Sequence, residues 1–502
     1  MKLPEGYLNR MRRQLGEDFD AYMAAMAEPE KRAARCNGLK LTREGLADLR
    51  PDFVPAGGDG FLLPAGFAPG KDPLHAAGAY YVQELSAQVP AGLFDLKPHM
   101  ALLDLCAAPG GKASQLAARV PEGVIFANEI VPGRASVLLG NLERMGVKNG
   151  VVTNMEPEKL IRFTGPVFDG VLVDAPCAGE GMFRKDPEAV AAWSEEHVQA
   201  CAHRQRAILA SAQGAVKPGG QLVYSTCSFS PAENGENVRW FLSEYPDFEL
   251  ESEQTLYPHA CLGEGQYAAK LRRRGAAPDT GYLPQKSDGA PLAEGFLREE
   301  TAGLGGPLRL LADGRALLLP PLPCDLAGLR VLRAGLLAGE IVKGRFVPAH
   351  AKGFEERPDL VLIDGGATHA AAAREIIDAF DMALPVLGMV KDGHHRTRAL
   401  VSADGEEIGI KNEQSLYTFI GRMQEEVHRF AITHHRKRRD SRVKRSELDG
   451  ISGIGEKRKM ALLAHFKSIK AISAADIETL SAVVPKNAAE AVYKYFHTGE
   501  MK

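Results

Sequence analysis

The chain has 502 residues, of which 45% are hydrophobic and 25% charged, a composition typical of a globular protein. Its length predicts about three domains, and its net charge of -3 excludes a uniformly basic nucleic-acid binder. No apolar run approaches the roughly 20 residues that span a bilayer, and the amphipathic N-terminus is typical of neither a secretory signal nor a transit peptide. Seven cysteines without a CxxC pair argue against a zinc site and a disulfide framework, and we therefore expect a cytoplasmic protein without a membrane partner.

The predicted elements of the N-terminal two thirds form an α/β pattern. Residues 1–48 carry helical periodicity, and from about 75 to 250 apolar strands alternate with helices. This alternation predicts a parallel, doubly wound sheet. The expected strands are 101–105, 123–129, 150–154, 168–175 and 220–227. The longest expected helix runs from Ala189 to Val216, and residues 251–345 predict short strands and turns.

The texture of the sequence changes around 346–358, where we place a junction. Beyond it we expect strands at 359–364 and 385–391 with a helix between them, and then a long helix that ends near His428. The last 60 residues predict short helices around a Gly-containing turn. The expected domains are 1–48, 49–250, 251–350, 357–435 and 440–502.

A Gly-rich turn, DLCAAPGGK (104–112), lies between the first expected strand and a helix. Its backbone N–H groups and the helix N-terminus would face a ligand. The turn fits neither GxGxxG nor a P-loop. Glu129 follows the next strand, where an acid accepts hydrogen bonds from ribose hydroxyls. Because such a turn is as often a tight connection as a binding site, it does not decide the function alone.

Two cysteines follow neighbouring strands of the expected sheet. Cys177 lies in DAPCAGEGMFRKDP (174–187) and Cys227 in YSTCSFSPAENGENV (224–238). Both would lie at the carboxyl edge of the sheet, where open α/β sheets bind ligands. The alternative is that both are small buried apolar residues, as most free cysteines are. Their position after polar turns favours a chemical role.

These motifs occur in order with HAAGAYYVQELSA (75–87) and, over residues 1–350, resemble the Nol/Nop/Sun family of S-adenosylmethionine-dependent RNA cytosine-5 methyltransferases. The resemblance implies a Rossmann-like methyltransferase core with a small α+β appendage. It also implies an N-terminal helical RNA-binding region at 1–48 and a truncated RNA-binding region at 251–350, whose clearest stretch is LRVLRAGLLAGEIVKGRFVPAHA (329–351). The expected substrate is an unpaired cytosine in RNA, with ribosomal RNA as the first candidate.

The resemblance also implies roles for individual residues. Cys227 corresponds to the nucleophile, Cys177 to the cysteine that helps release the product, and Lys112 and Asp174 would face the target base. For the acid after the third strand, Asn154 and Glu156 are alternatives. The residues implied to hold the cofactor are Cys106, Ala107, Ala108, Pro109, Gly110, Gly111, Lys112, Glu129, Arg134, Asn154, Glu156 and Asp174.

The chemistry of the reaction agrees with these roles. C5 of cytosine is a poor nucleophile, and a thiolate that adds to C6 makes C5 enamine-like. An acid near N3, for which Asp174 is the candidate, would stabilise the electron density that develops there. The base must leave its stack to reach the pocket, so single-stranded or loop RNA is the natural substrate.

From about residue 357 to the end, the chain resembles a second family, the C-terminal part of the nicking component of excinuclease ABC, the enzyme of bacterial nucleotide excision repair. The motifs that carry this resemblance are PDLVLIDGG (358–366), VKDGHHRTR (390–398), EEVHRFAITHHRKRR (425–439) and SELDGISGIGEKRKMALLAHF (446–466). It implies a truncated RNase-H-like α/β segment and an all-α tandem helix-hairpin-helix. The partners it implies are the B component of excinuclease ABC or other repair proteins.

The implied nuclease site is incomplete. Asp364 and His428 fall on catalytic or metal-binding positions, although a turn acid and a solvated histidine are the alternatives. The first strands of the nuclease and their aspartate are absent, because the chain upstream of Asp359 is methyltransferase-like. We therefore expect Mg²⁺ or Mn²⁺ only if the remnant is active.

The helix-hairpin-helix motif is complete by contrast. Gly453, Gly455 and Lys457 of its turn would contact DNA phosphates. Arg438 and Arg439 lie in the preceding basic run RKRRDSRVKR, for which a solvated linker is the alternative.

The sequence as a whole predicts a fusion of an RNA cytosine-5 methyltransferase with a DNA-binding excinuclease tail. The alternative is an excision-repair protein that binds or nicks DNA and carries a vestigial methyltransferase half. The paired cysteines favour the first interpretation, and the missing nuclease aspartate weakens the second.

Overall fold

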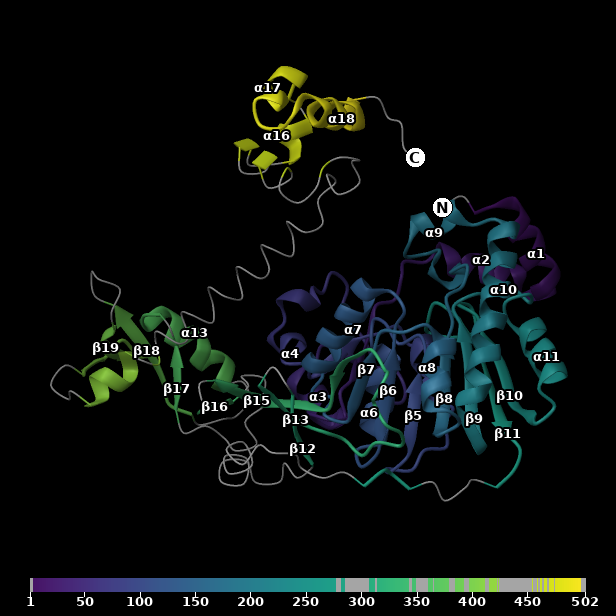
Figure 1. Cartoon of the computed structure of the whole chain (residues 1–502), viewed down its shortest axis with the longest axis horizontal. Coiled ribbons are helices and arrows are strands. Elements are labelled where there is room, and N and C mark those ends of the chain that lie inside the picture. The colour runs from purple at the N-terminus through teal and green to yellow at the C-terminus, as the bar shows by residue number, and fades with distance from the viewer. Residues whose placement is uncertain are drawn as a thin grey trace. The chain divides into compact units, whose positions relative to one another are not determined.

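The computed structural model describes most of the first 350 residues and parts of the remainder (Figure 1). The described ranges are 3–276, 281–284, 307–311, 314–342, 345–348, 360–363, 365–378, 384–391, 397–410, 415–421, 469–473 and 475–497, with isolated residues between 423 and 466. The chain divides into two compact units, 1–356 and 357–502, at the expected junction. None of the described helices is long and apolar enough to cross a membrane.

The N-terminal part combines helices with a small antiparallel sheet. Helices α1 (Glu5–Leu15) and α2 (Phe19–Ala27) pack through buried aromatic and methionine side chains. The sheet has the order β2-β3-β1-β4. Its strands are β1 (Ala33–Cys36), β2 (Val54–Pro55), β3 (Gly60–Leu62) and β4 (Tyr80–Val82).

The expected all-helical region 1–48 is therefore wrong in its last third. Strand β1 lies within it, and α3 (Arg43–Leu49) crosses its expected boundary. All four residues of β1 are buried, so the strand has no apolar–polar alternation that a sequence pattern could reveal. Its pairing partners are also distant, at residues 60–62 and 80–82.

The central sheet has eight strands in the order β10-β11-β9-β8-β5-β6-β7-β14 (Figure 1). The five expected parallel strands are present, and they are β5 (Ala101–Asp104), β6 (Val124–Asn128), β7 (Gly150–Thr153), β8 (Phe168–Asp174) and β9 (Val216–Thr226). Three antiparallel strands extend its edges, namely β10 (Phe248–Leu256), β11 (Gln266–Arg273) and β14 (Val331–Ala334). The expected boundary at residue 250 thus falls inside β10, because β11 pairs with both β10 and β9.

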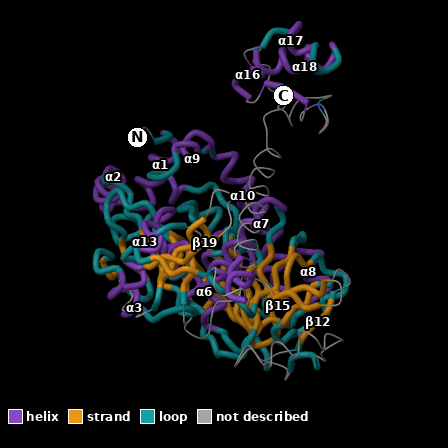
Figure 2. Tube along the Cα trace, turned by 90° about the vertical axis from the view of Figure 1, so that its left-hand side faces the viewer, coloured by secondary structure: helices purple, strands orange, loops and turns teal. Residues whose placement is uncertain are grey.

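Helices cover both faces of this sheet, as Figure 2 shows. Successive side chains of a strand enter different cores, as Leu102 and Leu103 of β5 do. Leu102 packs with α6 (Gly111–Arg119) and α7 (Pro132–Arg144). Leu103 packs with the helices of the opposite face, which are α8 (Pro157–Thr164), α10 (Glu195–Ala212) and α11 (Gly235–Glu244). This burial on both faces explains the continuous apolar runs of the parallel strands.

The long helix expected from Ala189 to Val216 is two helices. Helix α9 (Pro187–Ala192) ends before Trp193, and α10 begins after Ser194. The Ser194 side chain accepts a hydrogen bond from the backbone N–H of His197 at 3.1 Å, so it caps α10. Beyond α10, residues 213–215 form a 3₁₀ turn and Val216 already begins β9.

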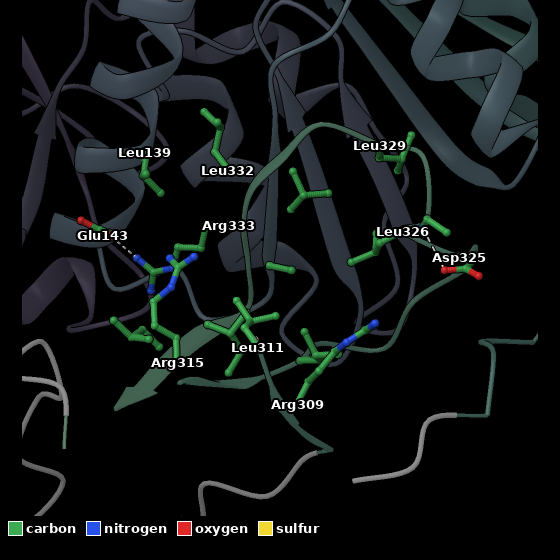
Figure 3. A pocket seen from close by; sticks show the side chains of 16 residues that line it. Leu139, Glu143, Arg309, Leu311, Arg315, Asp325, Leu326, Leu329, Leu332 and Arg333 are labelled. Atoms are coloured by element: carbon green, nitrogen blue, oxygen red, sulfur yellow. Dashed lines mark hydrogen bonds and ion pairs between the residues drawn. The ribbon is translucent and has the colours of Figure 1, made fainter. Parts of the chain in front are cut away.

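A second antiparallel sheet follows in the first unit, with the order β12-β13-β15-β16. Its strands are β12 (Leu308–Leu310), β13 (Arg315–Leu318), β15 (Leu336–Val342) and β16 (Arg345–Pro348). A pocket of about 360 Å³ lies between these strands, β14 and α7, and leucines dominate its lining (Figure 3). At one end Arg333 forms an ion pair with Glu143 of α7. None of the candidate site residues lines this pocket.

The second unit begins with a mixed sheet in the order β17-β18-β19-β20. Its elements are β17 (Val361–Ile363), α13 (Ala367–Asp378), β18 (Val386–Lys391), β19 (Thr397–Ser402) and β20 (Glu407–Gly409). Strands β17 and β18 are parallel with α13 between them, as expected. The hairpin β19–β20 that follows β18 was not expected; it precedes the helical residues 415–421, and the expected end of the long helix near His428 lies outside the described residues. The Asp-Gly turn signal of this hairpin is in the sequence, and Gly405 adopts a φ of 90°.

The C-terminal part is helical. Its described helices are α16 (Ile469–Ser473), α17 (Ile477–Ser481) and α18 (Lys486–His497). Buried apolar side chains from these helices, among them Ile472, Leu480 and Val492, form a core together with Ile454 and Leu462.

Candidate active site

The two cysteines lie together at the carboxyl ends of β8 and β9. The strands pair in parallel with Asp174 opposite Ser225, and the sulfur atoms of Cys177 and Cys227 are 3.2 Å apart. The hydrogen bond to Cys227, followed by burial, raises the pKa of the Cys177 thiol well above its ordinary value. Cys177 therefore keeps its proton at neutral pH and can donate it toward the Cys227 sulfur.

Glu180, which the sequence interpretation missed, fixes the two cysteine loops to each other. Its buried carboxylate accepts a hydrogen bond from the backbone N–H of Phe229 at 2.9 Å, two residues after Cys227. The backbone N–H of Gly181 donates to the carbonyl of Cys227 at 2.7 Å. Glu180 also forms an ion pair with Arg10 of α1 at 2.6 Å, so helix α1 stabilises the two cysteine loops.

Glu233, which was also missed, forms hydrogen bonds with both cysteine loops. Its carboxylate accepts hydrogen bonds from the backbone N–H of Ala178 and from Gln205 of α10, each at 2.9 Å, and from the hydroxyl of Ser228. Burial raises the pKa of Glu233. Each polar turn contains an acidic residue, Glu180 in the first and Glu233 in the second. The local sequence, however, does not distinguish these buried acids from ordinary solvent-exposed ones.

Lys112 and Asp174 form an ion pair beside the cysteines, with Nζ and Oδ2 2.7 Å apart. Burial would lower the pKa of Lys112, but the pair with Asp174 outweighs burial and the pKa is raised. The other carboxylate oxygen of Asp174 accepts hydrogen bonds from Ser225 at 2.7 Å and Gln266 at 3.3 Å. The pair is thus fixed in orientation where a substrate base would reach the sulfur atoms.

The Gly-rich turn is held through its carbonyl groups. The carbonyl of Ala108 accepts a hydrogen bond from Arg134 at 3.0 Å, and that of Pro109 accepts one from Asn141 at 2.8 Å. Gly110 has a φ of 113°, a conformation that favours glycine, and precedes the first residue of α6. The turn therefore leads into the N-terminus of α6, as expected.

Glu129 lies at the carboxyl end of β6 and is buried. One carboxylate oxygen accepts a hydrogen bond from the backbone N–H of Val131 at 2.9 Å, and the other pairs with Arg134 at 3.2 Å. Asn154 is buried and donates to the carbonyl of Glu129 at 2.6 Å. Glu156 is exposed and pairs with Lys159, so Asn154 and Glu156 both remain candidates for this position.

Asp104, the first residue of the Gly-rich motif, was not among the candidates. Its carboxylate is buried at the end of β5, and within the described part of the chain neither oxygen has a hydrogen-bond partner of good geometry, although the backbone of Cys106 lies close enough to lower its pKa slightly. Burial, reinforced by the nearby Asp174, raises the pKa of Asp104 to about 8. An unsatisfied buried acid of this kind fits a cationic ligand.

These residues fit S-adenosylmethionine, which the sequence resemblance implies. Asp104 would neutralise a cationic group of the cofactor, and Glu129 would accept hydrogen bonds from its ribose hydroxyls. The residues 106–111 would offer backbone groups to it. Cys106 is a partly buried neighbour in this turn, and burial raises the pKa of its thiol, so we assign it no nucleophilic role.

We expect Glu129→Ala to weaken the binding of S-adenosylmethionine by roughly 1–3 kcal/mol, as for the loss of a charge-assisted hydrogen bond. Isothermal titration calorimetry on the 1–350 fragment measures this. Glu158→Ala is the matched control, since its carboxylate is exposed and pairs with Arg162 on the surface of α8, and it should bind like the wild-type fragment. Unchanged affinity in Glu129→Ala contradicts the assignment.

We expect Asp104→Asn to stabilise the ligand-free protein and weaken cofactor binding. Because the pKa of Asp104 is raised on folding, stability is lost as the pH rises from about 4 toward 8. At pH 8 the variant should melt roughly 2–4 °C above the wild type, and the difference should vanish near pH 4. Thermal melts at the two pH values provide the measurement, and an equal or lower melting temperature at pH 8 would count against it.

The candidate residues of the C-terminal part lie outside the described residues. They are Asp364, His428, Arg438, Arg439, Gly453, Gly455 and Lys457. Within the described ranges, no group of three or more His, Cys, Asp or Glu side chains could hold a metal ion.

The fold and the site together define a Rossmann-like methyltransferase core, followed by an RNase-H-like segment and a helix-hairpin-helix region. Family models match in the same order. They are the N-terminal domain of 16S rRNA methyltransferase RsmF (3–85), 16S rRNA methyltransferase RsmB/F (91–289), the RsmF first C-terminal domain (296–351), the UvrC RNase H endonuclease domain (338–432) and a helix-hairpin-helix tandem (445–496).

Curated proteins that are similar over most of the chain are ribosomal RNA small subunit methyltransferases F. Ribosomal RNA small subunit methyltransferase F of Escherichia coli strain SMS-3-5 is 30% identical over 423 residues, covering 76% of this chain and 85% of the relative, and that of Shigella boydii serotype 4 matches equally. The chain belongs to the ribosomal RNA small subunit methyltransferase F family. A solved methyltransferase homologue from Pyrococcus horikoshii is 29% identical, with a TM-score of 0.47 over 53% of this chain and 93% of its own.

Proposed function

We propose that this protein is an S-adenosylmethionine-dependent methyltransferase that forms 5-methylcytosine in small-subunit ribosomal RNA. One observation supports this proposal above the others: the two cysteine sulfur atoms lie 3.2 Å apart at the ends of neighbouring parallel strands, beside the Lys112–Asp174 pair. A single nucleophile would need only one of these cysteines. Two thiols in contact match a reaction with one addition step and one elimination step.

In the proposed addition step, the Cys227 thiolate forms a bond to C6 of an unstacked cytosine. Electron density then moves toward N3 and C5 of the ring, where the Lys112–Asp174 pair stabilises it through charge and hydrogen bonds. S-adenosylmethionine, when bound, supplies the methyl group to C5. The protein positions the Cys227 sulfur, the target base and the Gly-rich turn relative to one another. The hydrogen bonds of Glu180 and Glu233 hold the two cysteine loops in place.

In the proposed elimination step, a solvent water accepts the C5 proton, the electrons of the C5–H bond form the C5=C6 double bond, and the C6–S bond breaks with its electron pair on the Cys227 sulfur, which restores the aromatic ring. The departing sulfur receives a proton or hydrogen bond from the Cys177 thiol. The raised pKa of Cys177 supports this role, because the group must hold its proton until the product leaves.

Bisulfite mapping of small-subunit RNA from cells with and without this gene tests the proposed function. We expect one or more cytosines to be protected from conversion only when the gene is present. A catalytically dead Cys227→Ala gene is the control for indirect effects. Identical protection maps in all three strains contradict the proposal.

A second function is proposed for the tail. The matches to the UvrC RNase H endonuclease domain and the helix-hairpin-helix tandem support an excinuclease origin and sequence-independent binding of duplex DNA. A protein whose methyltransferase half is vestigial would have no need to keep the Cys177–Cys227 contact and the Lys112–Asp174 ion pair. We therefore place the catalytic function in the first unit.

A further inference from the structure

Arg35 of β1 is a fully buried cation that contacts the first turn of α6, at the end of the Gly-rich turn (104–112). Its side chain is 1% exposed, yet it lies far in sequence from every residue of the candidate site. The guanidinium donates to the carbonyl of Gly111 at 3.0 Å and to the hydroxyl of Ser114 at 2.8 Å, both in the first turn of α6. It also donates to the side-chain carbonyl of Gln83 at 3.0 Å.

This placement is costly for the fold. Burial lowers the pKa of Arg35 to about 10, which still leaves the group charged at neutral pH. Among the described residues, its hydrogen bonds go to neutral acceptors; Asp59 raises its pKa through space, but no carboxylate forms an ion pair with it. The N-terminus of a helix is itself positive, so a cation beside the first turn of α6 repels the helix dipole. A neutral donor would make the same hydrogen bonds at lower cost.

The positive charge of Arg35 would stabilise a bound ligand if the part of the ligand at the N-terminus of α6 is an anion. Asp104 lies with both oxygens unpartnered at the start of the turn that leads into α6 and fits the cationic part of an amino acid. The carboxylate of an amino acid is bonded one carbon away from its ammonium group. A ligand whose ammonium group lies against Asp104 would therefore carry its carboxylate toward the turn and the N-terminus of α6.

We propose that Arg35 is a specificity-determining residue that raises the positive potential at the N-terminus of α6 and so selects a cofactor that carries a carboxylate. This inference depends on the proposed function, because it takes S-adenosylmethionine as the ligand. Arg35 acts through space from behind the turn. It belongs to the N-terminal sheet, so the N-terminal part contributes to cofactor binding as well as to any contact with RNA.

The test compares S-adenosylmethionine with decarboxylated S-adenosylmethionine, which keeps the sulfonium and an amine but lacks the carboxylate. Isothermal titration calorimetry on the full chain measures both affinities for the wild type, Arg35→Gln and Arg35→Lys. Arg119→Gln is the matched control, because Arg119 binds the carbonyls of Ala91 and Phe94 at the other end of α6.

We expect the wild type to prefer S-adenosylmethionine, and Arg35→Gln to lose about tenfold in affinity for it, as removal of one charge near a bound anion predicts. The decarboxylated form carries only positive charges, so its affinity should not fall in Arg35→Gln. Arg35→Lys and Arg119→Gln should keep the wild-type preference. Equal losses for both ligands in Arg35→Gln would show a purely structural role and overturn the inference.

The wild type alone provides a second test if Arg35→Gln fails to fold. Equal affinity of the wild type for the two ligands overturns the inference whatever the variants do. Failure of the wild type to bind either ligand contradicts the proposed function instead, so the two failures are distinguishable.

Discussion

Cys227→Ala will abolish methylation, whereas Cys177→Ala will leave a covalent protein–RNA adduct that survives a denaturing gel. Without the Cys227 sulfur no bond to C6 forms, and the rate should fall by roughly four orders of magnitude or more, as for the loss of a nucleophile. Without the Cys177 thiol, 3.2 Å away, the addition still occurs but the C6–S bond is not released. Gel mobility of labelled RNA and transfer of a labelled methyl group measure the two outcomes.

Cys201→Ala is the matched control for these variants. Cys201 is a buried free cysteine of α10, and its sulfur makes a weak contact with His197 at 3.7 Å. The variant should methylate RNA at the wild-type rate and leave no adduct. Cys227→Ala that methylates at the wild-type rate would show that the nucleophile is a different residue. An adduct in Cys227→Ala would show the same.

The parallel part of the central sheet can be predicted from the sequence because each of its strands contains a short apolar run followed by a polar motif. The candidate cysteines and the Gly-rich turn are predictable for the same reason, since the carboxyl ends of parallel strands meet at one edge. Strand β1 is not predictable in this way, because all four residues are buried and its partners lie far along the chain. The hairpin β19–β20 carries an Asp-Gly turn signal, so its sequence contains the information that the expected long helix ignores.

The supporting residues of the site are harder to predict than the reacting ones. Glu180, Glu233 and Arg35 act through hydrogen bonds to loops and helices that are distant in sequence. In the sequence each looks like an ordinary charged residue in a turn or a short segment. Asp104 is hidden differently, because its importance depends on the absence of any partner around its buried carboxylate, which only packing reveals.

The protein will bind duplex DNA through its C-terminal part but will not nick it. A two-metal nuclease needs ligands on both sides of the attacked phosphate, and we expect the strand that would supply the first aspartate to be missing, because the sequence upstream of Asp359 resembles the methyltransferase family. Asp364 and His428 alone could hold at most one poorly placed ion. The measurement is a supercoiled-plasmid nicking assay with Mg²⁺ or Mn²⁺, and nicking that disappears in Asp364→Ala would show that a metal site has been rebuilt.

The predicted DNA binding can be recognised by its dependence on salt and its independence of DNA sequence. A helix-hairpin-helix contacts phosphates through backbone N–H groups and nearby Lys or Arg, so the affinity for DNA should fall steeply with salt concentration and vary little with DNA sequence.

Gly453→Pro removes a backbone donor from the turn, and Arg438→Glu with Arg439→Glu reverses two charges of the basic run. Both changes should weaken binding to all sequences alike in filter assays at two salt concentrations. Arg374→Glu, on the exposed side of α13 beside Asp378, is the matched charge-reversal control and should bind normally, because it belongs neither to the basic run 436–445 nor to the helix-hairpin-helix match at 445–496. Salt-independent binding, or equal loss in the control, would place the DNA contact elsewhere.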